Sequence, residues 1–170
     1  MDLDLENLAA GYRFNPTAEE LLMQYLCPRR SYMPVPCGDR IVKDVELYGK
    51  ENPWTLFGVT DESQECCFFV FTYLKKLSGE NGRPRPNERK IRRAGSGVWT
   101  SRRVNDVKDS EGNVIGVDRY YFFSTGEDKK KNVHGRWTMH EVICIVACNT
   151  QIVIKHTASG IRPQDPAQGS

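Results

Sequence analysis

Residues 87–106 read Asn-Glu-Arg-Lys-Ile-Arg-Arg-Ala-Gly-Ser-Gly-Val-Trp-Thr-Ser-Arg-Arg-Val-Asn-Asp. The Gly95-Ser96-Gly97 triplet predicts a bend, because glycine adopts backbone angles that other residues avoid. The Val98-Trp99 pair then opens a run that is typical of a β-strand. This order of residues predicts a short arginine-bearing strand that projects from the domain.

Eight cations fall between positions 83 and 103, and only Glu88 opposes them. They are Arg83, Arg85, Arg89, Lys90, Arg92, Arg93, Arg102 and Arg103. A solvated face is the default interpretation of a basic run. Arginine, however, presents a planar, always-charged fork that fits phosphates and guanine edges bidentately. We therefore predict a sheet edge that binds double-stranded DNA.

The length of 170 residues fits one domain, which we place at 1–156, followed by a disordered tail at 157–170. The hydrophobic fraction of 39% and charged fraction of 27% are typical of a globular protein. Residues 1–74 carry a net charge of −6 and residues 75–170 a net charge of +8. This asymmetry predicts a basic pole for polyanions, with the acidic half facing elsewhere. No apolar run is long enough for a membrane helix, and the acidic N-terminus is unlike a signal peptide.

The six cysteines form no CxxC pair, which favours reduced thiols in an intracellular protein. Zinc held by Cys144, Cys148 and a histidine is the alternative. His140-Glu141 lacks the second histidine of a zinc hydrolase, and no phosphate-binding loop or nucleophile elbow is present. We predict no enzyme activity, no metal, no other cofactor and no small-molecule substrate.

The Thr17-Ala-Glu-Glu20 spacing predicts a capping box, followed by an amphipathic helix over 17–27 that Pro28 ends. Before it, Tyr12-Arg13-Phe14 is typical of a short arm that pairs with another chain. Residues 31–58 are rich in proline and glycine, so we expect extended loop with helical turns at 42–48 and 52–54.

The remaining expected elements are strands at 66–73, 98–107, 114–117, 119–124, 136–146 and 151–154, with a hairpin turn at 109–113. Trp54 would plug the core, and Trp137 and Met139 would share one face of a strand. The predicted class is α+β: a twisted antiparallel β-sheet flanked by an N-terminal helix and short helical turns.

Alternation along 98–107 divides the candidate DNA contacts between two faces. If Trp99 points into the core, Ser101, Arg103 and Asn105 share its face, whereas Thr100, Arg102, Val104 and Asp106 point away. Arg89, Arg92 and Arg93 precede the bend and would contact phosphates. A core-facing arginine is costly, so Arg103 would require an irregular strand.

Four blocks in order resemble the NAC domain of plant transcription factors. They are Gly11-Tyr12-Arg13-Phe14-Asn15-Pro16-Thr17-Ala18-Glu19-Glu20-Leu21, then Glu46-Leu47-Tyr48 with Pro53-Trp54, then Arg92-Arg93-Ala94-Gly95-Ser96-Gly97-Val98-Trp99, then Trp137-Thr138-Met139-His140-Glu141. The likeness covers about residues 8–146. It implies a twisted antiparallel sheet, dimerisation through the N-terminal arm, a nuclear location, and an edge strand that enters the major groove.

By motif position, the resemblance implies two sets of functional residues. The dimer interface would comprise Leu8, Tyr12, Arg13, Phe14 and Glu20, with reciprocal Arg13–Glu20 salt bridges. The DNA contacts would comprise Arg89, Arg92, Arg93, Thr100, Ser101, Arg102 and Arg103. The expected partners are DNA and a second NAC protein, as homodimer or heterodimer.

The sequence departs from the family pattern after the bend. Trp-Lys-Ala-Thr-Gly-Thr-Asp-Lys is usual, whereas Thr100 and Asp106 replace both lysines here and Arg103 replaces the glycine. We expect a changed DNA preference, with Arg102 as a substitute base reader. The alternative is an interaction module with weakened or lost DNA binding that regulates other family members. Independently of this choice, the chain is either a piece of a longer protein or a domain-only form that represses full-length relatives.

Overall fold

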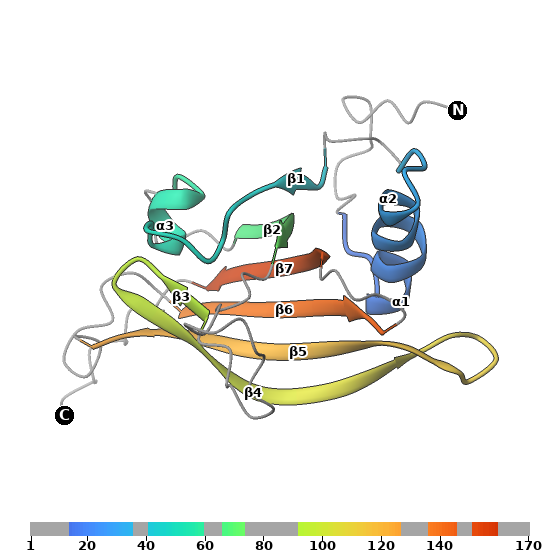
Figure 1. Ribbon diagram of the computed structural model, residues 1–170. Coiled ribbons are helices and arrows are strands. Elements are labelled where there is room, and N and C mark those ends of the chain that lie inside the picture. The colour runs from blue at the N-terminus through green and yellow to red at the C-terminus, as the bar shows by residue number, and fades with distance from the viewer. Residues whose placement is uncertain are drawn as a thin grey trace, which may run out of the picture.

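Figure 1 shows a computed structural model of the chain. The structure describes residues 14–35, 41–59, 66–73, 92–126, 136–145 and 151–159, the last range by its backbone. A seven-stranded sheet in the order β1-β2-β7-β6-β5-β4-β3 forms the centre. Its strands are β1 Lys43–Asp44, β2 Cys66–Tyr73, β3 Arg92–Ala94, β4 Gly97–Lys108, β5 Val114–Thr125, β6 Arg136–Cys144 and β7 Gln151–Ser159. Only the β1–β2 pair is parallel among the described strands, so the predicted α+β class with an antiparallel sheet is confirmed.

The N-terminal helix consists of α1 Ala18–Glu20, the π-helical segment η2 Leu21–Leu26, and α2 Cys27–Arg30. The predicted capping box is confirmed: the Thr17 hydroxyl accepts from the Glu20 amide at 3.2 Å, and the Glu20 carboxylate accepts from the Thr17 amide at 2.7 Å. The expected stop at Pro28 is wrong, because the helix continues to Arg30. The Cys27 amide bonds to the Leu22 carbonyl five residues back, and this wider turn accommodates the proline ring.

The sheet buries both of its faces against different layers. On the α1 face, Phe71 and Val142 pack in a cluster with Leu22 and Leu26 of η2. On the α3 face, Trp99, Tyr121, Trp137 and Met139 form a second cluster. This face is covered by residues 41–59, which include α3 Pro53–Leu56 (Figure 1). Side chains of neighbouring positions reach different clusters because they alternate across a strand.

Several predicted boundaries change in the structure. The helical turn expected at 42–48 is wrong, since this stretch contains the extended strand β1, whereas the turn at 52–54 is confirmed as α3. Trp54 is partly buried against the second cluster, as expected. The strands predicted at 114–117 and 119–124 form one strand, β5. β7 includes Thr157–Ser159, which the sequence assigns to the tail, and residues 160–170 lie outside the described part.

Candidate nucleic-acid interface

The bend predicted at Gly95-Ser96-Gly97 is a two-residue hairpin turn between β3 and β4. Gly95 has φ +55°, and a side chain there would put its Cβ 2.7 Å from the backbone nitrogen of Asn52. The Asn52 Oδ1 accepts hydrogen bonds from the Ser96 amide and hydroxyl, each at 3.0 Å. The Gly95 amide donates to the Gly49 carbonyl at 3.1 Å. The turn is therefore fixed from outside the sheet by the loop that leads into α3.

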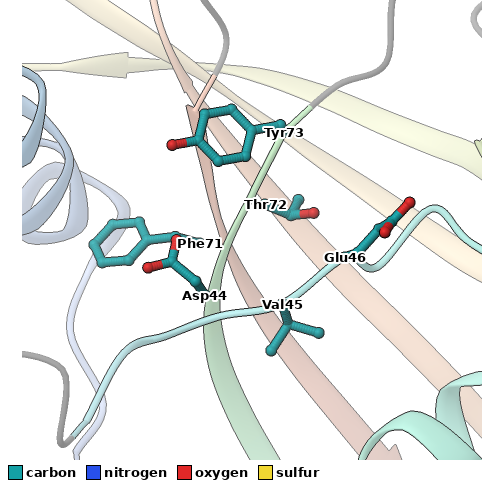
Figure 2. A pocket seen from close by; sticks show the side chains of 6 residues that line it. All are labelled: Asp44, Val45, Glu46, Phe71, Thr72 and Tyr73. Atoms are coloured by element: carbon teal, nitrogen blue, oxygen red, sulfur yellow. The ribbon is translucent and has the colours of Figure 1, made fainter.

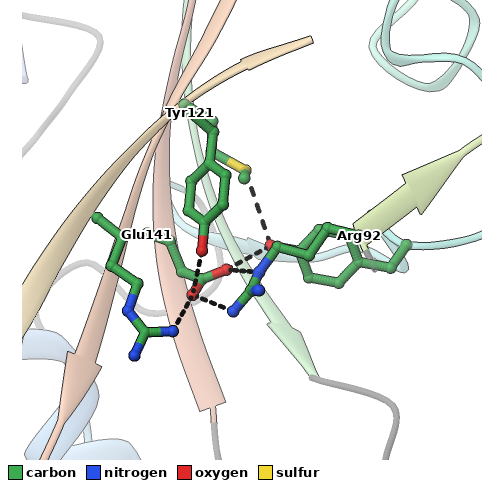
Figure 3. A network of polar contacts seen from close by, with 6 residues as sticks. Arg92, Tyr121 and Glu141 are labelled. Atoms are coloured by element: carbon green, nitrogen blue, oxygen red, sulfur yellow. Dashed lines mark hydrogen bonds and ion pairs between the residues drawn. The ribbon is translucent and has the colours of Figure 1, made fainter. Parts of the chain in front are cut away.

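Arg92 holds β3 against the sheet and does not extend into solvent. Its Nε and Nη2 donate to the two carboxylate oxygens of Glu141 on β6, the second at 2.6 Å (Figure 3). The Arg92 side chain is 7% exposed and that of Glu141 is fully buried. The expectation that Arg92 contacts phosphate is thus wrong for this geometry, because its Nε and Nη2 donate to a buried carboxylate.

Three further side chains complete the network around Glu141. The Tyr48 hydroxyl donates to it at 2.7 Å and the Tyr121 hydroxyl at 3.4 Å. Nη1 of Arg119 lies 4.0 Å away. Figure 3 shows Arg92 and Tyr121 approaching the Glu141 carboxylate from different strands. The network therefore joins the loop at 41–59 to strands β3, β5 and β6.

Burial and the Glu141 charge shift the pKa values of the surrounding groups. Burial raises the pKa of Tyr48 well above its ordinary 10.0, and the nearby Glu141 carboxylate raises it further. The pKa of Tyr121 is raised for the same two reasons. Burial opposes the charge of Arg92, but the Glu141 hydrogen bond and charge outweigh it, so the pKa of Arg92 is raised. Arg92 is consequently a permanent structural cation.

β4 contains a β-bulge at Arg102. Ser101 pairs with Tyr121 of β5, and the next pair is Arg103 with Tyr120, so Arg102 is the additional residue. A bulge places two residues of one strand opposite one residue of its partner and changes the alternation beyond it. Arg103 consequently shares the α1 face with Tyr120, away from the Trp99 cluster.

The bulge corrects the face assignments made from simple alternation. Trp99 is buried and Ser101 shares its α3 face, as expected. Arg103 does not share that face. Conversely, Val104 pairs with Arg119 and Asp106 with Val117, so these two residues lie on the α3 face, although alternation put them on the other. The irregular strand that Arg103 required is present.

Four of the predicted DNA contacts lie together on the exposed part of the α1 face. We call this set the arginine face; it consists of Arg93, Thr100, Arg102 and Arg103. All four residues are exposed. Among the described residues, none of its three arginines forms an ion pair with a carboxylate. Ser101 is exposed on the opposite face, and Arg89 lies outside the described residues.

Two aromatic rings beneath the arginine face were not predicted as site residues. The guanidinium carbon of Arg102 lies 5.7 Å from the Phe122 ring centroid, and that of Arg103 lies 5.7 Å from the Tyr120 centroid. The two ring centroids are 5.1 Å apart. The Tyr-Tyr-Phe-Phe run at 120–123 carried the necessary signal, since consecutive rings of a strand lie on opposite faces and Tyr120 and Phe122 therefore share one face. Alternation alone could not tell which pair faces the core.

The predicted dimer residues lie mostly outside the described part of the chain, which excludes Leu8, Tyr12 and Arg13. Phe14 packs within its own chain, with its ring centroid 4.7 Å from that of Phe69. The carboxylate of Glu20 is exposed and takes part in the capping box.

A second candidate site lies at the other end of the strand order. An open hollow of about 390 Å³ is lined by Asp44, Val45, Glu46, Phe71, Thr72 and Tyr73 (Figure 2). The Asp44 carboxylate accepts from Arg29 Nη2 at 2.5 Å. The hollow contains two carboxylates and no unpaired cation among its lining residues, so it does not suit a polyanion. It lies at the edge of the sheet opposite to β3 and β4.

Metal-binding side-chain groups and long apolar helices are both absent from the described ranges. No group of three histidine, cysteine, aspartate or glutamate side chains is placed there to hold a metal ion. Over the same ranges, no helix has the length and apolar character needed to cross a membrane. Cys27 and Cys144 are free thiols, and Cys148 is outside the described residues.

Comparison with known proteins identifies the family. The sequence profile described as "No apical meristem (NAM) protein" matches residues 9–143. The chain belongs to the NAC domain family. The match includes the turn, the buried network and the whole arginine face. Members of this family are generally plant transcription factors and not enzymes.

Three relatives illustrate the extent of the NAC similarity. NAC domain-containing protein JA2 of Solanum lycopersicum is 35% identical over 136 residues, which are 79% of this chain and 36% of JA2. NAC domain-containing protein 72 of Arabidopsis thaliana is 34% identical over 140 residues, 79% of this chain and 42% of that protein. NAC domain-containing protein 67 of Oryza sativa subsp. japonica is 34% identical over 142 residues, which are 79% of this chain and 45% of that protein. The chain thus spans less than half the length of these relatives.

Proposed function

We propose that this NAC domain binds double-stranded DNA sequence-specifically through the arginine face and serves a plant transcription factor in the nucleus. The observation that carries the proposal is the grouping of Arg93, Arg102 and Arg103 on one exposed face without carboxylate partners in the described residues. Lone cations on an exposed strand favour a polyanionic partner. The proposal includes no enzymatic activity, cofactor or small-molecule substrate.

The shape of the β3–β5 region supports entry into the major groove. A two-stranded ribbon fits the major groove of B-form DNA, where base edges present distinct hydrogen-bonding patterns. β4 and β5, each twelve residues long, are the edge ribbon of the sheet: β5 also pairs with β6, whereas β3, among the described strands, pairs only with the first three residues of β4 (Figure 1). Arg93 lies on the edge strand and is suited to phosphate contact, while Thr100 and Arg102 lie further along the ribbon. Arg89 remains a proposed phosphate contact.

A salt titration tests the proposal directly. The affinity for duplex DNA should fall steeply with salt, and removing one phosphate-neutralising arginine should reduce the slope of log K against log salt by about 1. Arg93→Ala is expected to show this change. Lys43→Ala is the matched control, because it removes one exposed positive charge from β1 at the other edge of the sheet. Absence of saturable binding at low salt would refute the proposal.

We also propose that the domain dimerises through its N-terminal arm, with Arg13 and Glu20 in reciprocal ion pairs and Leu8, Tyr12 and Phe14 in the interface. Glu20→Gln separates this role from helix capping, because glutamine also completes a capping box. The variant should therefore weaken the dimer, measured by analytical ultracentrifugation, and leave thermal stability nearly unchanged. Equal dimer affinity of the wild-type domain and the Glu20→Gln variant would contradict the proposed Arg13–Glu20 ion pair.

The competing function is a NAC interaction module that has lost DNA binding and regulates other family members through heterodimers. The loss of both family lysines at Thr100 and Asp106 favours it. Mixing with a full-length NAC protein would then give heterodimers whose DNA affinity is lower than that of the full-length homodimer. A domain that binds DNA by itself excludes this alternative.

A further inference from the structure

The bulge in β4 places two consecutive arginines, Arg102 and Arg103, side by side on one face. In a regular strand, neighbouring side chains point to opposite faces, and those on the same face are roughly 6.6 Å apart along the strand. Consecutive Cα atoms are about 3.8 Å apart. Consecutive bases on one DNA strand are separated by about 3.4 Å along the helix axis. The bulged pair therefore matches the spacing of neighbouring bases, whereas a regular strand would pass over every second base.

Each of these guanidinium groups has its own aromatic support. Arg102 lies over Phe122 and Arg103 over Tyr120, both at 5.7 Å from guanidinium carbon to ring centroid. The rings pack edge to face, with 5.1 Å between centroids, and Tyr120 is also in contact with His140 at 4.7 Å. His140 is held in turn by Asp118, whose carboxylate lies 3.0 Å from the ring nitrogen. A supported arginine loses less side-chain freedom when it binds, which favours a directed contact over diffuse neutralisation.

We infer that Arg102 and Arg103 read two adjacent guanines on the same DNA strand. This inference rests on the proposed function and names the sequence element that the arginine face recognises. Arginine is the side chain that contacts guanine O6 and N7 bidentately in the major groove. A contact between a guanidinium and an aromatic face uses the charge of the arginine and none of its N–H donors, so it does not compete with a bidentate base contact.

Contact with phosphates is the alternative role for the Arg102–Arg103 pair, which we call the doublet. A lysine substitution distinguishes phosphate contact from guanine contact. A lysine retains the positive charge but lacks the planar fork, so it neutralises phosphate and cannot replace a bidentate base contact. Both arginines are exposed, so Arg102→Lys and Arg103→Lys should fold normally, and a thermal melt checks this. Arg93→Lys is the matched control, since Arg93 lies on the same face but on β3.

The experiment selects bound sequences from a pool of short duplexes with a randomised centre. The wild-type domain should enrich sites that contain two adjacent guanines. Each doublet variant should lose the preference at one of the two positions, whereas Arg93→Lys should retain both preferences. Replacing either guanine of the selected site by 7-deazaguanine, which lacks N7, should lower wild-type affinity roughly 5- to 150-fold.

Three results would overturn the inference. Selected sites without adjacent guanines, or a preference that survives in both lysine variants, would refute guanine reading while leaving DNA binding intact. Failure to bind any duplex at low salt would refute the proposed function and this inference with it. The outcomes are therefore distinguishable from one another.

Discussion

Replacing Glu141 by glutamine tests whether the buried network holds the β3–β4 hairpin in place. Glutamine has nearly the same shape, so the change removes the charge without creating a cavity. Arg92, whose side chain is 7% exposed, would then be a buried cation facing a neutral amide. Removing one partner of a buried ion pair costs about 3–5 kcal/mol of unfolding free energy. For a domain of this length, such a loss lowers Tm by about 6–20 °C.

The assay is urea unfolding at neutral pH, followed by circular dichroism and tryptophan fluorescence. Asp44→Asn is the control, because the Asp44–Arg29 pair has the same chemistry but the Asp44 side chain is 53% exposed. Exposed pairs contribute about 0–1 kcal/mol, so this variant should remain close to wild type. The double variant Arg92→Met/Glu141→Gln should be less destabilised than the sum of its single changes. If Glu141→Gln costs no more than Asp44→Asn, the assigned role of the network is wrong.

Three more results are expected. Thr17→Ala should lower stability by about 1 kcal/mol through loss of the capping box, measured by urea unfolding, and Thr17→Ser should retain most of it. Gly95→Ala should destabilise the domain, because alanine at φ +55° is strained and its Cβ would collide with Asn52; unchanged stability would show that the turn relaxes freely. The raised pKa of Tyr48 means that its contribution is present below pH 10 and is lost as pH rises toward its folded value. Tyr48→Phe should therefore flatten the alkaline stability profile, and an unaltered profile would count against this reasoning.

Local signals in the sequence were sufficient to predict most helices and strands. Thr17 and Glu20 mark the helix start by chemistry that acts within four residues, and the structure contains the same two hydrogen bonds. The glycines at 95 and 97 likewise locate the turn before β4. The three-residue strand β3 was missed because it is too short for alternation to be seen. Its position depends on pairing with β4 and on Arg92.

The candidate site was predictable only in part, because the missing information is non-local. Arg92 looks like any other arginine of the basic run, and its partner Glu141 lies 49 residues further along the chain. Nothing near Arg92 in sequence marks it as buried. The bulge at Arg102 is similar, since the additional residue becomes visible only when β4 is paired with β5. Composition therefore located the basic surface, but tertiary pairing decided which of its arginines face solvent.

The additional residue in β4 also makes the length of this strand as important as its composition. Deleting the single amino acid at position 102 would restore regular pairing, because Ser101 already pairs with Tyr121 and Arg103 with Tyr120. Arg103 would stay opposite Tyr120 and Val104 opposite Arg119, so the residues that follow would keep their faces. A one-codon deletion should consequently remove one arginine of the adjacent pair while the rest of the strand keeps its register, and it should change base preference more than it changes stability.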